Sequence, residues 1–130
     1  MLRSFILGLC LIALPAGAQA GVIRPVSEKS SFQIALEGKL PVMVLFQGKN
    51  CAACRAVELW IDQMSGELDG KVDMVSLDID ENPYTKDEFG VEGTPTLLMF
   101  RDGEQTAAMV GATDREDLRA FIAKGAGITL

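Results

Sequence analysis

Apolar stretches of two kinds alternate along this chain. Pro41 to Phe46 is a short, Val-containing apolar run, which is typical of a strand buried on both faces. After it, apolar residues recur at helical spacing, at Val57, Trp60, Ile61 and Met64. Residues 72–80 partly alternate between apolar and polar, which predicts a second central strand. The pattern therefore predicts a domain of alternating strands and helices.

Shorter signals predict the remaining elements. Residues 22–26 predict a weak edge strand, interrupted by Pro25, and a helix follows within Ser27 to Gly38, capped by Ser30 or Ser31. Asn82-Pro83 opens a short helix that Gly90 closes, and Thr96 to Phe100 and Gln105 to Val110 form a hairpin around Asp102-Gly103. The last helix is capped by Thr113 or Asp114 and has Leu118, Phe121 and Ile122 on one face. The crossovers favour parallel pairing, and the hairpin favours an antiparallel edge.

Two cysteines lie where the buried strand ends and the helix begins. The first turn of a helix favours a thiolate through its unpaired N–H groups and the positive end of its dipole, and Cys51 holds that position. Arg55 can add positive charge on the same side. Cys54 shares the helical face but lies deeper towards the core. We therefore predict that Cys51 attacks a disulfide and that Cys54 resolves the mixed intermediate.

Three other interpretations of the cysteine pair remain open. A purely structural disulfide would close so short a loop that it stabilises by only about 2 kcal/mol. Two thiolates also suit a soft metal ion, but the chain has no His and few cysteines, so a four-ligand zinc site is not available. Two inert core cysteines are the third interpretation. We favour a redox pair without a metal.

The first twenty residues are typical of a secretory signal peptide. Arg3 precedes a short apolar run over residues 5–14, and Ala18-Gln19-Ala20 supplies a small-residue cleavage site. Cleavage after Ala20 would discard Cys10 and leave residues 21–130, the size of one domain. A retained membrane anchor is the alternative interpretation. We predict a periplasmic protein, in a compartment where disulfides persist and are exchanged.

The charge balance excludes some partners. The chain has 12 Lys and Arg against 18 Asp and Glu, for a net charge of −6, and the predicted cleavage also removes Arg3. Such an acidic domain is a poor ligand for nucleic acid or for an anionic membrane surface. We therefore expect neither as a partner.

The cysteines belong to a longer set of motifs. Cys51-Ala52-Ala53-Cys54 follows a hydrophobic strand. Two segments lie downstream of it, Leu77 to Pro83 and Phe89 to Thr96, and the second contains Gly93-Thr94-Pro95-Thr96. The Asp102-Gly103 turn and Val110-Gly111-Ala112 complete the set. On these residues the chain, from about Val42 to Lys124, resembles the thioredoxin family. The resemblance implies an α/β thioredoxin fold, a central mixed sheet of four to five strands flanked by helices. It also implies that Pro95 is cis and lies against the cysteines, and that the backbone of Thr94 pairs with an incoming extended peptide.

The chain departs from thioredoxin proper around the cysteines. Asn50 stands where the family has Trp, Leu45 replaces a buried Asp, and Ser76 replaces a Lys. In the family that acid assists proton transfer at the resolving thiol, so another group or water must do so here. Glu58, four residues beyond Cys54, is a candidate, although an exposed helical Glu is the simpler interpretation.

These departures favour a reducing role. The Ala52-Ala53 dipeptide lacks the His of strongly oxidising relatives. Because it ends with Ala, it is similar to the dipeptide between the two cysteines in the C-terminal domain of the transmembrane disulfide-interchange reductase. We predict a monomeric thiol–disulfide oxidoreductase that acts on protein disulfides, receives electrons from a membrane-embedded donor and needs no cofactor beyond the Cys51–Cys54 pair. The alternatives are an oxidase or isomerase of the same fold, a copper-delivery module and a non-catalytic chaperone-like module.

Overall fold

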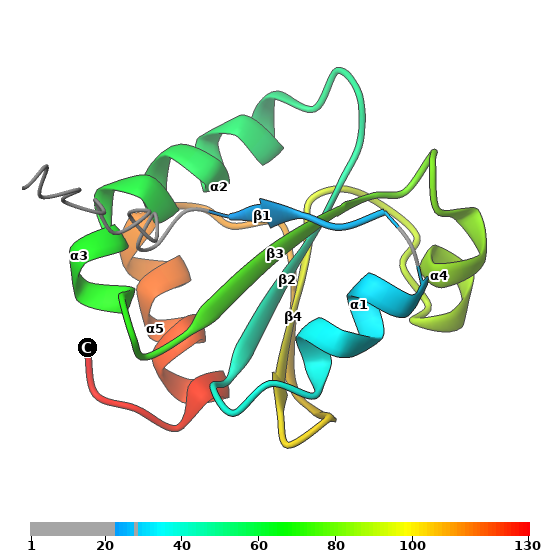
Figure 1. Ribbon diagram of the computed structural model, residues 1–130. Helices are drawn as coiled ribbons and strands as arrows, with labels where there is room; N and C mark the ends of the chain where they lie inside the picture. Colours follow the sequence, from blue (N-terminus) through cyan, green and yellow to red (C-terminus); the bar gives the residue numbers. More distant parts are fainter. Residues whose placement is uncertain (1–22, 28) are drawn as a thin grey trace, which may run out of the picture.

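The computed structural model describes residues 23–27 and 29–130, and it shows one mixed sheet with helices on both faces (Figure 1). The strands are β1 (Arg24–Pro25), β2 (Val42–Gln47), β3 (Asp73–Asp78), β4 (Thr96–Arg101) and β5 (Glu104–Val110). The helices are α1 (Lys29–Leu36), α2 (Ala52–Gln63), α3 (Ser65–Leu68), α4 (Pro83–Glu88) and α5 (Arg115–Ala126).

The sheet combines parallel and antiparallel pairs in the order β1-β3-β2-β4-β5. β1 and β2 both pair with β3 in parallel, with Val44 opposite Val75 in the β2–β3 register. β4 runs antiparallel to β2, and β5 returns antiparallel to β4 through the tight turn at Asp102 and Gly103, both of which have positive φ. The predicted mixed sheet of four to five strands, its weak edge strand and its hairpin are confirmed, and the sheet has five strands.

β2 is apolar on both faces because each face packs against helices. Val42, Val44 and Phe46 belong to a core cluster with residues of α1, and none of the three is more than 1% exposed. Met43 and Leu45 belong to a second cluster with residues of α2 and α5, and both are completely buried. The strand that carries the site at its end therefore lies in the middle of the hydrophobic core.

The structure differs from the prediction at the start of α1 and adds a short helix after α2. α1 begins at Lys29, so Ser30 and Ser31 lie inside its first turn and not before it, where a cap residue stands. After α2 the chain turns at Met64 and forms the additional short helix α3, whose Leu68 is completely buried. The last helix agrees with the prediction, since Asp114 Oδ1 accepts a hydrogen bond of 2.9 Å from the backbone N–H of Asp117.

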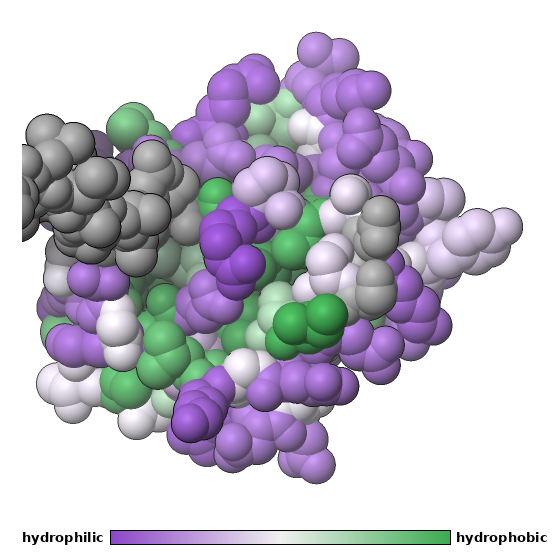
Figure 2. Space-filling view, in the orientation of Figure 1, coloured by the Kyte–Doolittle hydropathy of each residue, from purple (hydrophilic) through white to green (hydrophobic). Residues whose placement is uncertain are grey.

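Large hydrophobic side chains at the surface are scattered over the described part of the chain. The exposed ones are Ile34 on α1, Leu59 on α2, Tyr84 on α4, Val110 on β5, and Leu40. On the face that carries β1 and α1, hydrophobic atoms show between hydrophilic side chains (Figure 2). Single exposed apolar residues of this kind are normal on a soluble surface.

The predicted signal peptide, residues 1–20, lies outside the described residues. Among the residues that are described, none of the helices is both long and apolar enough to cross a bilayer. The alternative of a retained N-terminal anchor concerns the same undescribed segment.

Because of an ion pair between α3 and α5, the free energy of unfolding should depend on pH in the acid range. Arg119 Nε donates to both carboxylate oxygens of Glu67, at 3.0 and 3.2 Å, and this hydrogen bonding lowers the pKa of Glu67 below its ordinary value. A lowered folded-state pKa means that the contribution is present when Glu67 is ionised and is lost as the pH falls through acid values. We expect Glu67→Gln to lose less stability than the unaltered protein between about pH 6 and pH 3. Urea unfolding at several pH values measures this slope.

The matched control for this measurement is Glu92→Gln, because Glu92 is an exposed carboxylate outside the pair. It should leave the pH slope close to that of the unaltered protein. Equal slopes for Glu67→Gln and the unaltered protein would contradict the expected role of the ion pair.

Candidate active site

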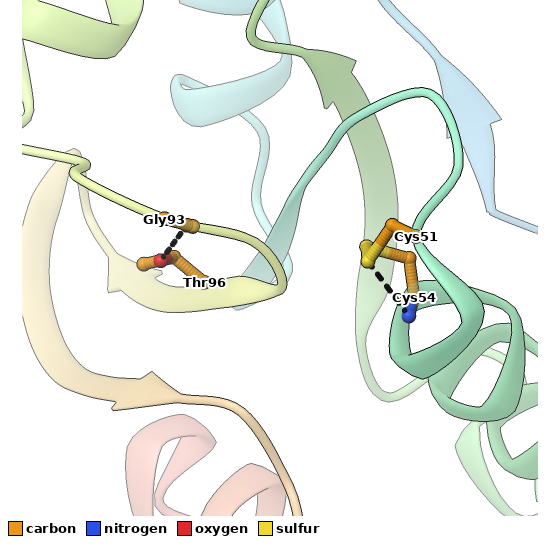
Figure 3. The surroundings of a disulfide bond; sticks show 4 residues. All are labelled: Cys51, Cys54, Gly93 and Thr96. Carbon is orange, nitrogen blue, oxygen red and sulfur yellow. Dashed lines mark hydrogen bonds between the residues drawn. A yellow bond between two sulfur atoms is a disulfide. The ribbon is translucent and has the colours of Figure 1, made fainter.

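The cysteine pair occupies the start of α2. Cys51 is the N-cap residue in an extended conformation, and its Sγ accepts a hydrogen bond of 3.1 Å from the backbone N–H of Cys54 (Figure 3). The two residues form a disulfide, with their Cα atoms 5.2 Å apart. One of the unpaired N–H groups of the helix therefore points at the first sulfur, an arrangement that favours negative charge there when the bond is reduced.

The two sulfurs differ in their access to solvent. Cys54 is only 2% exposed and packs in the interior, whereas Cys51 is partly exposed. The difference follows from the helix, because position 54 faces the sheet and position 51 stands at the end of the strand–helix loop. A protein partner can therefore approach Cys51 but not Cys54.

The loop between β2 and α2 reaches its tight shape through Asn50. Asn50 has a φ of 58°, in the left-handed region that Asn tolerates better than most residues, and it is exposed. A Cβ placed at Gly48 would lie 3.6 Å from Thr94 Oγ1 and 3.8 Å from Asp80 Oδ2. The loop that leads to the cysteines therefore lies against the loop that precedes β4.

That second loop contains a cis peptide bond between Thr94 and Pro95, as the resemblance implied. Thr96 Oγ1 donates to the carbonyl of Gly93 at 2.7 Å, and the backbone N–H of Gly111 donates to the carbonyl of Pro95 at 2.8 Å. Figure 3 shows the Gly93–Thr96 loop opposite the disulfide, with the sulfurs on the side of the helix start that is turned towards it. Pro95 is buried and Thr94 is partly exposed.

Two interior positions that are charged in the family are uncharged here. Leu45 on β2 lies opposite Ser76 on β3 in the parallel register, and the two are 0% and 4% exposed. The positions are therefore neighbours, as the resemblance implied, but neither side chain carries an ionisable group. Any acid that serves Cys54 must come from another element.

The other predicted site residues take different places around the pair. Arg55 is exposed on the outside of α2, and Asn50 is exposed in the preceding loop. Glu58 is partly buried and lines a hollow beside the sheet. The structure thus places the Thr94-Pro95 loop opposite the Cys51–Cys54 pair, and Glu58 beside the hollow next to the sheet (Figure 3).

One supporting residue was missed from the sequence as part of the site. Gly111 has a φ of 71° and donates the hydrogen bond that holds Pro95. A glycine directly after a strand was the available signal, because such a position favours a turn with positive φ. In residues 23–27 and 29–130, no group of three or more His, Cys, Asp or Glu side chains is placed to hold a metal ion.

Comparison with known proteins gives one consistent result. The family model described as Thioredoxin matches residues 23–124. The thioredoxin of Rickettsia conorii is 37% identical over 99 residues, which are 76% of this chain and 94% of that protein. The thioredoxin of Synechocystis sp. is 36% identical over 76% of this chain and 92% of its own length. The structure of a single-site mutant of thioredoxin from Halobacterium salinarum superposes with a TM-score of 0.74 at 23% identity, covering 88% of this chain and 100% of that one, which supports the fold.

Proposed function

Because the chain belongs to the thioredoxin family, we propose that it uses its cysteine pair to reduce protein disulfides in the periplasm. The chain is a thiol–disulfide oxidoreductase with a thioredoxin fold. The observation that carries the proposal is the unequal exposure of two bonded sulfurs at one helix start, with Cys51 reachable and Cys54 2% exposed. Such a pair forms a mixed disulfide at one sulfur and releases it with the other.

Two exchange steps complete one turnover. The Cys51 thiolate attacks one sulfur of the substrate disulfide, the substrate S–S bond breaks, and the leaving thiolate takes a proton. The thiolate of Cys54 then attacks Cys51 Sγ, which breaks the mixed disulfide and releases the second substrate thiolate. The enzyme dithiol is oxidised to the Cys51–Cys54 disulfide and the substrate disulfide gains two electrons.

The Thr94-Pro95 loop supplies the docking surface in this proposal. Thr94 is partly exposed, and the loop faces the disulfide while the carbonyl of Pro95 is already bonded to Gly111 (Figure 3). An extended peptide that pairs with the backbone at Thr94 would place its cysteine near Cys51. Asn50 and Arg55 are exposed and adjoin the cysteines in the chain, so in this proposal they would modulate access and charge.

The reducing direction rests on the chemistry of the pair. Cys51 Sγ accepts a backbone hydrogen bond, but Ala52 and Ala53 offer no imidazole to stabilise the thiolate further. A less stabilised thiolate makes the dithiol a better electron donor. An oxidase or isomerase of the same fold is the rival, and the reduction potential separates the two.

The compartment and the electron source follow from the chain's N-terminal pattern. Residues 1–20 have the pattern of a signal peptide, so the mature enzyme would act in the periplasm. A monomeric enzyme there would depend on a membrane-embedded donor, because that compartment is kept oxidising and offers no thiol buffer.

One experiment tests direction and compartment together. The full chain with a C-terminal tag is expected in the periplasmic fraction in a form that begins at Gly21. Supplied with a small dithiol, this form should reduce a disulfide-containing protein, and its reduction potential should be more negative than about −200 mV. Exchange with glutathione measures the potential.

Two results would overturn the proposal. A potential near about −120 mV would assign the chain to the oxidising rival. A full-length form that stays in the cytoplasm would contradict the compartment.

A further inference from the structure

A hollow of small-molecule size lies between α2 and the β1–β3 side of the sheet (Figure 1). Its volume is about 320 Å³, at the lower end of the range of about 300–1,000 Å³ that is typical of small-molecule sites. It opens to solvent past Pro25 and Asp62, which are both exposed. The residues that line it are Ile23, Pro25, Gln47, Glu58, Asp62 and Ser76. The hollow thus has an apolar wall and four polar side chains.

Two of the polar side chains come from the face of the sheet that α2 covers. Gln47 follows Leu45 by two residues in β2, and Ser76 follows Met74 by two residues in β3. Residues two apart in a strand share one face, and Leu45 and Met74 belong to the core cluster that contains residues of α2. The side chains of Gln47 and Ser76 therefore extend towards α2, where the hollow lies.

Ser76 brings to the hollow a hydroxyl group that has no partner. The residue is only 4% exposed, and its backbone carbonyl accepts a hydrogen bond of 2.8 Å from the backbone N–H of Val26. Within residues 23–27 and 29–130, Ser76 Oγ makes no hydrogen bond, yet no fully enclosed side-chain oxygen or nitrogen lacks one. The hydroxyl of Ser76 therefore meets the open space of the hollow, where a ligand can bond to it.

The other two polar side chains are carboxylates on α2 without a cation. Glu58 and Asp62 are four residues apart, a spacing at which like charges on a helix repel one another. In the part of the chain that the structure describes, neither carboxylate forms an ion pair. The guanidinium of Arg24, next to Pro25 in the chain, binds Asp73 instead, at 2.7 Å. The hollow therefore favours a positively charged ligand.

We propose that this hollow binds a small aliphatic amine in its ammonium form. An ammonium group has three N–H donors, and Glu58, Ser76 Oγ and the amide oxygen of Gln47 are acceptors in the hollow. The methylene groups of such a ligand would pack against the apolar wall of Ile23 and Pro25. The inference goes beyond the proposed function and does not depend on the exchange reaction.

The lining favours an organic cation over a metal ion. Hard metal ions prefer a shell of several oxygen ligands, and an apolar wall offers none. Among the described residues, no group of three or more His, Cys, Asp or Glu side chains is placed to hold such an ion. An aliphatic ammonium ion uses both the polar and the apolar parts of the lining.

The spacing of the two carboxylates suits a diamine. Four residues of an α-helix span about 6 Å, at 1.5 Å per residue, and the two nitrogens of extended putrescine, a four-carbon diamine, are a similar distance apart. Glu58 is partly buried, whereas Asp62 is exposed at the opening. One ammonium group would therefore bind inside the hollow at Glu58, and the second would bind at the opening, at Asp62.

An NMR titration with putrescine tests the site. The isotope-labelled protein is purified from cells that express the full chain, with the Cys51–Cys54 disulfide oxidised as in the structure. Saturable shifts are expected at the amides of Gln47, Glu58 and Ser76. Glu58→Gln should weaken binding about tenfold or more, which is the effect of losing a hydrogen bond to a charged group. Asp62→Asn should weaken it less, because exposed ion pairs contribute little.

Glu92→Gln is the matched control, since it removes one negative charge from an exposed position outside the hollow. It should bind putrescine as the unaltered protein does. Butanediol, the neutral diol of the same length, and magnesium chloride should cause no saturable shifts at these amides. The proposal would be overturned by an absence of saturable shifts, by equal weakening in Glu58→Gln and Glu92→Gln, or by comparable binding of the diol or of Mg²⁺.

Discussion

Cys51→Ser is expected to abolish disulfide reduction, with a loss on the order of 10³-fold or more, because a serine hydroxyl stays protonated and does not attack sulfur. The structure supports so large an effect, since Cys51 is the sulfur that a partner can reach and Cys54 is only 2% exposed. Turnover of a disulfide-containing protein with a small dithiol as electron source measures it. Activity that survives the substitution would end the assignment of Cys51 as the nucleophile.

Cys54→Ser is the matched variant and should fail in a different way. It keeps the Cys51 thiol at the helix start and the backbone N–H of residue 54 that binds its sulfur. Attack should therefore proceed, while release should stop, so covalent adducts with substrate proteins should accumulate. Non-reducing electrophoresis of extracts from cells that express the variant would show these adducts and identify the substrates. Adducts that form with Cys51→Ser and not with Cys54→Ser would reverse the two roles.

Gly125→Ala is expected to cost about 1–3 kcal/mol of stability, as overpacking in a well-packed core does. A Cβ at this position of α5 would lie 2.6 Å from Met99 Cβ and 3.2 Å from Ala107 Cβ, and Met99 is completely buried in β4. The helix backbone thus rests directly on the sheet and must move away to admit one methyl group. The sign of this change in stability is informative, because Ala in place of Gly inside a helix normally stabilises by about 1 kcal/mol.

Gly66→Ala is the control for this substitution. Gly66 is also helical, in α3, but a Cβ there would meet nothing within 4 Å. We expect it to leave stability unchanged or to raise it by up to about 1 kcal/mol. Urea midpoints at constant m-value compare the two variants. Similar midpoints for both would show that the α5–β4 contact can relax without cost.

Most secondary structure could be predicted because its signals are local. The apolar run before Cys51, the helical spacing from Val57 to Met64 and the Asp102-Gly103 turn each lie within a few residues. The reactive pair could be predicted for the same reason, since the junction of a buried strand with a helix places Cys51 at an N-cap. The start of α1 is different, because the helix begins at Lys29, before the two serines that the sequence offers as caps, Ser30 and Ser31.

Local patterns by themselves thus determined which segments are strands and helices and which sulfur is exposed, since both follow from backbone periodicity. The tertiary structure decided the strand order, the contact of Gly125 with Met99 and the place of Glu58 in a hollow opposite Ser76. Each of these depends on atoms that belong to residues distant in the chain. A helical pattern shows that one face is buried, but only the packed structure shows what lies against it.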